Sequence, residues 1–164
     1  MGRRSRAGER GQVAVYAVLL FPLLMLVLSL VLAVGTLEGM RARLRAQIDM
    51  AALTATQALD VAALAAGGPP RLVPDEAAQL ARQYLAQNLP ASSNLLGASP
   101  ADIAAGAQVS VTNASGVDPI TGAANAAPTV SIEIRAPVRV PLLGLAGLGP
   151  VVTLEITGSA AARS

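Results

Sequence analysis

The feature that most constrains this chain is an uncharged stretch of 27 residues between Arg10 and Glu38. Its central part, Val13–Val34, contains eight Leu, six Val and one Phe among 22 residues. At 1.5 Å per residue such a helix is about 33 Å long, which matches a hydrocarbon core of about 30 Å. The Leu, Val and Phe side chains together favour insertion by roughly 4–9 kcal/mol. We therefore predict one transmembrane helix over residues 13–35, with Pro22 accommodated inside it.

The charges beside this segment predict its orientation. Residues 1–12 carry a net charge of +3, residues 38–45 carry +2, and residues 46–164 carry −3, so the overall charge of +2 hides a gradient. The more positive flank of a span usually stays in the cytoplasm. We therefore expect residues 1–12 to form a basic tail on the cytoplasmic side of the membrane. The C-terminal part would then lie outside, in the periplasm or beyond the cell.

A cleaved signal peptide is the alternative interpretation of the same segment. Ala33-Val34-Gly35 places small residues at a suitable spacing for signal peptidase, behind a basic N-terminal region. A signal peptide usually has only about 7–15 apolar residues, fewer than this segment has. On this alternative the protein is a secreted or anchored extracytoplasmic binding module with a mature start near Thr36.

A helical pattern continues beyond the apolar segment. Apolar residues recur at steps of three and four from Leu37 to Ala66, until Gly67-Gly68-Pro69-Pro70 stops the pattern. We predict an amphipathic stalk helix over residues 36–66, continuous with the span. Its Ala-rich seam would let a neighbouring helix approach closely. The residues expected to face that partner helix are Leu44, Ile48, Ala51, Ala55 and Leu59.

The remaining residues, 71–164, predict a small extracytoplasmic α+β domain. One helix is expected from Asp75, as its N-cap, to Pro90, and a short one from Ser99-Pro100. After residue 107 the apolar pattern changes to a period of two, which predicts three or four antiparallel strands with one polar face. These strands are Val109–Thr112, Val130–Arg135, Val138–Val140 and Val152–Thr157.

Two connections in this domain have unusual compositions. Asn113–Pro128 is rich in Gly, Asn, Asp, Pro and Ala, and we predict a long loop there. Pro141–Pro150 is apolar and rich in Gly, but it is too short to span a bilayer. Because an exposed apolar loop usually marks an interaction, we expect it to touch the membrane surface or a partner.

The side chains that carry most enzyme chemistry are scarce. The chain has no Cys and no His, and its twelve basic residues are all Arg. This removes thiolate and imidazole chemistry and most zinc sites. The acids Asp49, Asp60, Asp102 and Asp118 match no metal-loop spacing, so we interpret them as solvated surface acids.

Two further acids fall on the polar face of the predicted sheet. Glu133 and Glu155 are expected to pair there with Arg135 or Arg139. A carboxylate-pair hydrolase built on the two acids is the remaining enzyme hypothesis. We otherwise expect no catalytic, cofactor-binding or metal-binding residue, no nucleic-acid partner, no small-molecule substrate and no enzyme activity.

One run of residues resembles a known family. Arg10-Gly11-Gln12-Val13-Ala14-Val15-Tyr16-Ala17, Pro22 and Asp49-Met50-Ala51-Ala52-Leu53 are similar to the N-terminus of TadE/TadG-like pilus-assembly proteins of the tight-adherence (Flp) system. The Pro-Leu-Leu-Gly-Leu linker and the ending Gly158–Arg163 are also similar. The resemblance implies a membrane-anchored structural or assembly component of a bacterial cytoplasmic membrane, either minor pilin-like or TadG-like. Its partners would be membrane lipid and other pilin-like or Tad subunits, contacted through the N-terminal helix.

The resemblance also implies a possible processing site. In the pilin-like members a prepilin peptidase cuts after a Gly that is followed five residues later by Glu. Aligned on this sequence, Gly11 is that glycine and Gln12 the new N-terminus, but Tyr16 stands at the Glu position. Tyr cannot supply the buried anion, and the TadG-like members also lack the Glu, so the sequence is closer to them. The alternative interpretation of Gly11 is an ordinary helix start.

Overall fold

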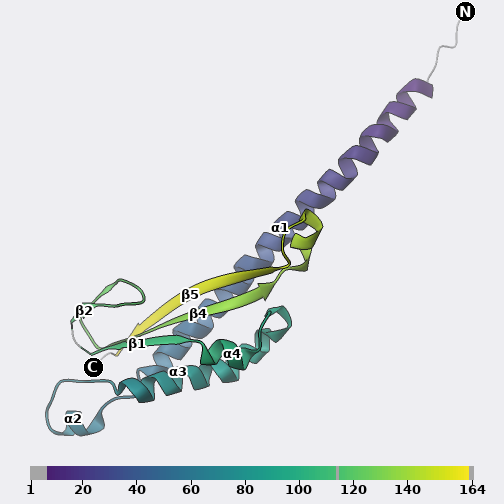
Figure 1. The fold of residues 1–164 in the computed structure, drawn as a ribbon. Helices are drawn as coiled ribbons and strands as arrows, with labels where there is room; N and C mark the ends of the chain where they lie inside the picture. The colour runs from purple at the N-terminus through teal and green to yellow at the C-terminus, as the bar shows by residue number, and fades with distance from the viewer. Residues whose placement is uncertain (1–6, 114, 163–164) are drawn as a thin grey trace, which may run out of the picture.

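The N-terminal element, α1 (Ala7–Ala55), is one unbroken helix of 49 residues and therefore about 74 Å long. A computed structural model describes residues 7–113 and 115–162 of the chain. Its fold is α+β, as the sequence predicted. Figure 1 shows that the N-terminal half of α1 projects away from all other elements, while the C-terminal half lies inside the head.

Polar groups in the apolar half of α1 are bonded within the helix. Ser29 Oγ donates to the Leu26 carbonyl at 2.8 Å, and Thr36 Oγ1 donates to the Leu32 carbonyl at 2.8 Å. Pro22 lies inside the helix without ending it. Hydroxyls that bond back to their own helix leave fewer polar groups to solvate, which suits a helix surrounded by apolar material.

The helix ends at Ala55, so the prediction that it continues to residue 66 is wrong. Leu59 instead forms a bridge with Leu72, and the Asp60 N–H donates to the Arg71 carbonyl at 2.8 Å. The chain after α1 thus turns back so that residues 59–60 pair with residues 71–72. Asn113 holds this pairing in place, because its amide group accepts from the Leu72 N–H (2.7 Å) and donates to the Leu72 carbonyl (2.8 Å). These bonds between distant segments outweigh the helical preference of the Ala-rich run.

The head contains short helices beside the end of α1: α2 (Val61–Ala65), α3 (Pro74–Asn88), the 3-10 helix η1 (Leu89–Leu95) and α4 (Pro100–Ala105). Ser99 caps α4 as predicted, because its hydroxyl accepts from the Asp102 N–H at 3.1 Å. Asp75 is not the N-cap of α3. Val73 takes that place and Pro74 begins the helix, which puts Asp75 in the first turn, where a negative charge is still favourable.

The head's main sheet has the order β1 (Gln108–Thr112), β4 (Thr129–Arg139), β5 (Val151–Ala161), and both pairings are antiparallel. The two segments predicted around residues 130–140 are one strand, β4, which continues through Pro137. The Pro137 carbonyl accepts from Gly97 N–H at 2.7 Å. In a strand, the backbone nitrogen and oxygen of one residue point to the same side. The Pro137 nitrogen therefore points towards Gly97, and its lack of a hydrogen removes no bond to β5.

Part of the predicted loop is ordered as a second, smaller sheet. Within Asn113–Pro128, β2 (Gly116–Val117) pairs antiparallel with β3 (Ala124–Asn125). Between them the Asp118 N–H donates to the Ala123 carbonyl, and the Gly122 N–H donates to the Asp118 carbonyl, both at 2.9 Å. Gly122 has a φ of +69°, a left-handed conformation that Gly adopts without strain.

The core lies between the main sheet and two helices, α1 and α3. Alternate residues of β4 point into it, and Val130, Ile132, Ile134, Ala136 and Val138 are all buried. The helix layer contributes Met40, Leu44 and Ile48 from α1 and Ala81 and Leu85 from α3. The α1 helix packs on β5 and α3 packs on β1, so the C-terminal half of the long helix is a core element of the head.

The crossing of α1 over β5 depends on Gly158. A Cβ at this position would lie 2.8 Å from Ile48 Cγ2 and 2.5 Å from Asp49 Oδ1. Both distances are well below ordinary van der Waals contact, so any side chain here would push the helix and the strand apart.

Candidate functional site

The projecting half of α1 is the largest apolar surface of the described chain. From Tyr16 to Leu32, every side chain that the structure describes is exposed except that of Ser29. Within residues 7–113 and 115–162, α1 is the one helix that is long and apolar enough to cross a membrane. A continuous exposed apolar surface of this size marks an interaction site for a membrane or for another protein.

The residues predicted to face a partner helix are instead covered by the chain itself. Leu44, Ile48, Ala51 and Ala55 are fully buried between α1 and the head, and Leu59 lies beyond the end of the helix, half-buried. The physical reason is that the apolar stripe is the contact surface for α3 and the sheet. The face expected for another subunit is therefore occupied within the chain.

Gly11 and Gln12, the residues of the possible processing site, lie in the first turns of α1. They follow Ala7, the first described residue, by four and five positions. The backbone around them is helical and continuous with the apolar half.

The polar face of the sheet carries one group of charges. The Arg135 Nη2 atom lies 3.3 Å from Glu133 Oε1 and 3.4 Å from Glu155 Oε1, and Arg135 stands opposite Glu155 in the β4–β5 register. The predicted pairing across the sheet is confirmed for Glu155, whereas Glu133 contacts Arg135 from the same strand, two residues before it. The guanidinium lies between the carboxylates, where a two-carboxylate hydrolase would have to place the scissile bond. The arrangement thus accounts for both acids as partners of a solvent-facing arginine.

Asp118 is the most constrained acid, and the prediction that it is a solvated surface residue is wrong. Its carboxylate accepts from the N–H groups of Ile120 (2.7 Å) and Thr121 (2.8 Å) and from the hydroxyl of Ser131, and it is almost completely buried. Burial acts to raise the pKa of this carboxyl, but the hydrogen bonds from Ser131, Thr121 and Ile120 outweigh it and hold the pKa below its usual value. Asp118 therefore anchors the β2–β3 hairpin on the polar face of β4.

The remaining acids of the sequence-predicted group stay apart. Asp60 caps α2 by accepting from the Ala63 N–H at 2.9 Å, and Asp102 lies in the first turn of α4. Asp49 lies on the exposed side of α1. In the part of the chain that the structure describes, no three acids gather into a group that would hold a metal ion.

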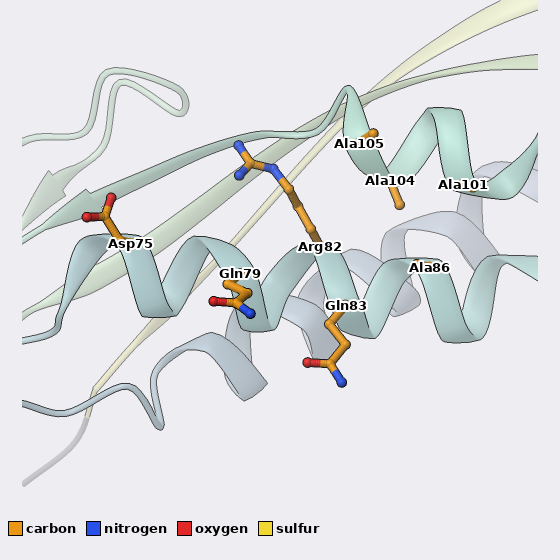
Figure 2. A pocket seen from close by; sticks show the side chains of 8 residues that line it. All are labelled: Asp75, Gln79, Arg82, Gln83, Ala86, Ala101, Ala104 and Ala105. Atoms are coloured by element: carbon orange, nitrogen blue, oxygen red, sulfur yellow. The ribbon is translucent and has the colours of Figure 1, made fainter.

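A shallow groove of about 620 Å³ lies between α3 and α4. Figure 2 shows that Gln79 and Gln83 extend from α3 on the side away from Arg82, while the Arg82 guanidinium points towards the chain that follows α4. Arg82 Nη2 lies 3.5 Å from the Ala107 carbonyl, a long hydrogen bond that ties α3 to the start of β1. The rest of the groove is lined by alanines and Asp75, so it offers polar contacts without a nucleophile and base among its lining residues.

Three structurally decisive residues escaped the sequence reasoning: Asn113, Asp118 and Gly158. The Asn-Ala-Ser-Gly-Val-Asp segment has the composition of a turn, which predicts side-chain bonds to nearby backbone groups. It does not indicate which distant segments Asn113 and Asp118 would bond. Gly158 carried a local signal, because a glycine inside an alternating strand marks a bulge or a close approach.

Comparison with protein-family models, with curated proteins and with solved structures finds no match to this chain.

Proposed function

We propose that this protein is a membrane-anchored structural or assembly component of a Tad-type pilus, acting as a minor pilin-like or TadG-like subunit. The observation that carries the proposal is the division of α1 into an exposed apolar half and a half buried in a small head. A pilin-like subunit needs this division, because its helix must sit in lipid or among like helices while its head stays outside. The residues from Arg10 to Leu53 that resemble the TadE/TadG-like family support the same assignment.

The anchored form is favoured over release by signal peptidase. Ala33 is fully buried and belongs to the same cluster of buried side chains as Met40 and Leu143. Cleavage near Gly35 would remove Ala33 from that cluster and would have to occur inside a continuous helix. The folded head therefore includes residues on the membrane side of the predicted cleavage position.

The surface offered to other subunits would be the exposed part of α1. The stripe from Leu44 to Ala55 is used inside the chain, which leaves the apolar half around Leu24 and the exposed side chains of Met50 and Leu53. We expect pilin-like partners to pack on these side chains, within the membrane and just outside it, while the head remains at the surface of the assembly.

Photo-crosslinking in cells that assemble the pilus tests this proposal. A photoreactive amino acid at Leu24 or Met50 should give adducts with pilin-like or Tad subunits. The same residue at Gln79, exposed on α3, is the matched control and should give few. Alkaline carbonate extraction of the same cells should leave the full-length chain in the membrane pellet. Release by carbonate would refute the anchor, and equal adducts from all three positions would refute the pilus assignment.

A further inference from the structure

The connection between β4 and β5, residues 140–150, is an apolar element at one end of the head. It contains the 3-10 helix η2 (Pro141–Ala146), and no charged residue occurs from Val140 to Leu154. Leu143 is buried against the core, whereas Leu148 remains 56% exposed and the adjoining Val151 49% exposed. Figure 1 shows this connection, the yellow-green coil, beside α1 at the point where the projecting half of the helix begins.

The place of contact on α1 sets the depth of this connection relative to a bilayer. A hydrocarbon core of about 30 Å takes about 20 helical residues, which from Val13 ends at Leu32. The headgroup layer adds roughly 5–7 Å on each side, or another three to five residues, to about Leu37. The η2 helix packs on α1, and Ala33 and Leu37 are the α1 members of the core nearest the projecting half, where Figure 1 shows the connection beside the helix. The connection thus lies at the level of the headgroups.

We propose that residues 140–150 form a second membrane contact, in which Leu148 and its neighbours insert into the headgroup layer of the phospholipid bilayer. This inference rests on the proposed membrane anchor and adds to it. A head held by the helix and by this connection would be fixed in its tilt and rotation on the bilayer, rather than free to swing about the end of the span.

The backbone of the connection suits a layer of low polarity. Pro141 and Pro150 carry no N–H. The N–H groups of Val140, Leu143, Gly147 and Leu148 all donate to carbonyls within residues 140–150, over 2.7–3.2 Å. Few donors are therefore left to desolvate on contact with lipid, and the exposed groups are mainly apolar side chains, Gly and Pro.

Site-directed spin labelling tests the inference, because the natural chain has no Cys. Full-length single-Cys variants Leu148→Cys, Val117→Cys and Leu26→Cys would be labelled and reconstituted in vesicles of phosphatidylethanolamine and phosphatidylglycerol. Collisions with oxygen, which concentrates in lipid, are then compared with collisions with a water-soluble nickel chelate. Val117 is the matched control because it is an exposed apolar residue, 70% exposed, in β2 at the opposite end of the head.

The inference predicts a several-fold higher oxygen-to-nickel collision ratio at Leu148 than at Val117, in the direction of the ratio at Leu26. A ratio at Leu148 equal to that at Val117, with Leu26 in lipid, overturns the inference and leaves the anchor intact. A label at Leu148 shielded from both reagents also overturns it, since protein rather than lipid would then cover the connection. A water-accessible label at Leu26 overturns the proposed anchor itself.

A charge placed in the connection gives an independent check. Gly144 is exposed, and a Cβ there would meet nothing within 4 Å, so Gly144→Asp should fold normally. In the Leu148→Cys background it should lower the oxygen-to-nickel ratio towards that of Val117, while Gly144→Ala should not. An unchanged ratio in the Asp variant would also overturn the inference.

Discussion

Replacing Gly158 by Ala tests whether the long helix is a core element of the head. The strand β5 approaches α1 so closely that the new Cβ would lie 2.8 Å from Ile48 Cγ2 and 2.5 Å from Asp49 Oδ1. Asp49 is exposed and its carboxylate can rotate away. Ile48 is fully buried and cannot move without displacing the core. Since carbon atoms in contact are about 3.5–4.0 Å apart, helix and strand must separate by about 1 Å.

The expected loss of stability follows from this overlap. Overpacking of a buried site costs about 1–3 kcal/mol. Replacing Gly by Ala also restricts the unfolded chain, which returns about 0.4–1 kcal/mol. The middle of each range gives a net decrease in the free energy of unfolding of about 1.3 kcal/mol. For a folded unit of this size, that corresponds to a fall in Tm of roughly 5 °C.

Thermal unfolding of the full-length protein in detergent micelles, followed by circular dichroism, measures this change. Gly116→Ala is the matched control, because it also lies in a strand but a Cβ there would meet nothing within 4 Å. It should leave Tm unchanged or slightly raised. Gly158→Val should lower Tm further than Gly158→Ala, since it adds two more carbons at the same crossing.

A double-mutant cycle distinguishes the helix contact from a general intolerance of β5 to substitution. Ile48→Ala removes Cγ2, the carbon that the new Cβ would overlap. Gly158→Ala should therefore cost much less stability in the Ile48→Ala background than in the wild type. We expect an interaction free energy of about 0.5–3 kcal/mol between the two positions. If the two effects simply add, or if Gly158→Ala behaves like Gly116→Ala, the close packing of α1 on β5 is not what limits this position.

Three further predictions concern polar groups. Because the folded-state pKa of Asp118 is lowered, its stabilisation is present above the unfolded-state value of about 3.9 and is lost as pH falls through the folded value. The stability difference between wild type and Asp118→Asn should therefore be larger at pH 7 than at pH 3, and equal differences would contradict this role. Asn113→Ala should lower the free energy of unfolding by about 1–3 kcal/mol, since the buried Leu72 N–H loses its acceptor; Tm unchanged within error would contradict it. Glu155→Ala should cost only about 0–1 kcal/mol, because its ion pair joins a 59% exposed carboxylate to a 64% exposed arginine side chain, and a large fall in Tm would contradict that.

The parts of the fold that follow from local patterns were predictable. The apolar segment, the cap at Ser99 and the alternating strands each depend on residues a few positions apart, and the structure has all of them. The predicted strands Val130–Arg135 and Val138–Val140 stop on either side of Pro137, whereas the structure has one strand through it. Only the bond from Gly97 to Pro137 reveals that the Pro137 nitrogen faces away from β5.

The parts that depend on contacts distant in sequence were not predictable. The amphipathic stripe of α1 indicated that one helix face is covered, but periodicity cannot distinguish a partner subunit from the chain's own sheet. After α1 ends at Ala55, Leu59 pairs with Leu72, which is itself bonded to Asn113, more than fifty residues beyond the helix. The burial of Asp118 likewise depends on Ser131, from a strand that the sequence alone does not place beside it.

The continuity of α1 links its exposed apolar half to the stability of the head. The same helix supplies the exposed apolar half and, from Met40 to Ala55, a central part of the head core. A truncation that starts after Ala55 would leave the inner faces of α3 and β5 uncovered and should yield an aggregating chain. A truncation that starts near Thr36 retains the core helix from Met40 to Ala55 but loses Ala33 from the buried cluster. The smallest folded head therefore includes the second half of α1, and any force applied to the exposed apolar half acts directly on the core.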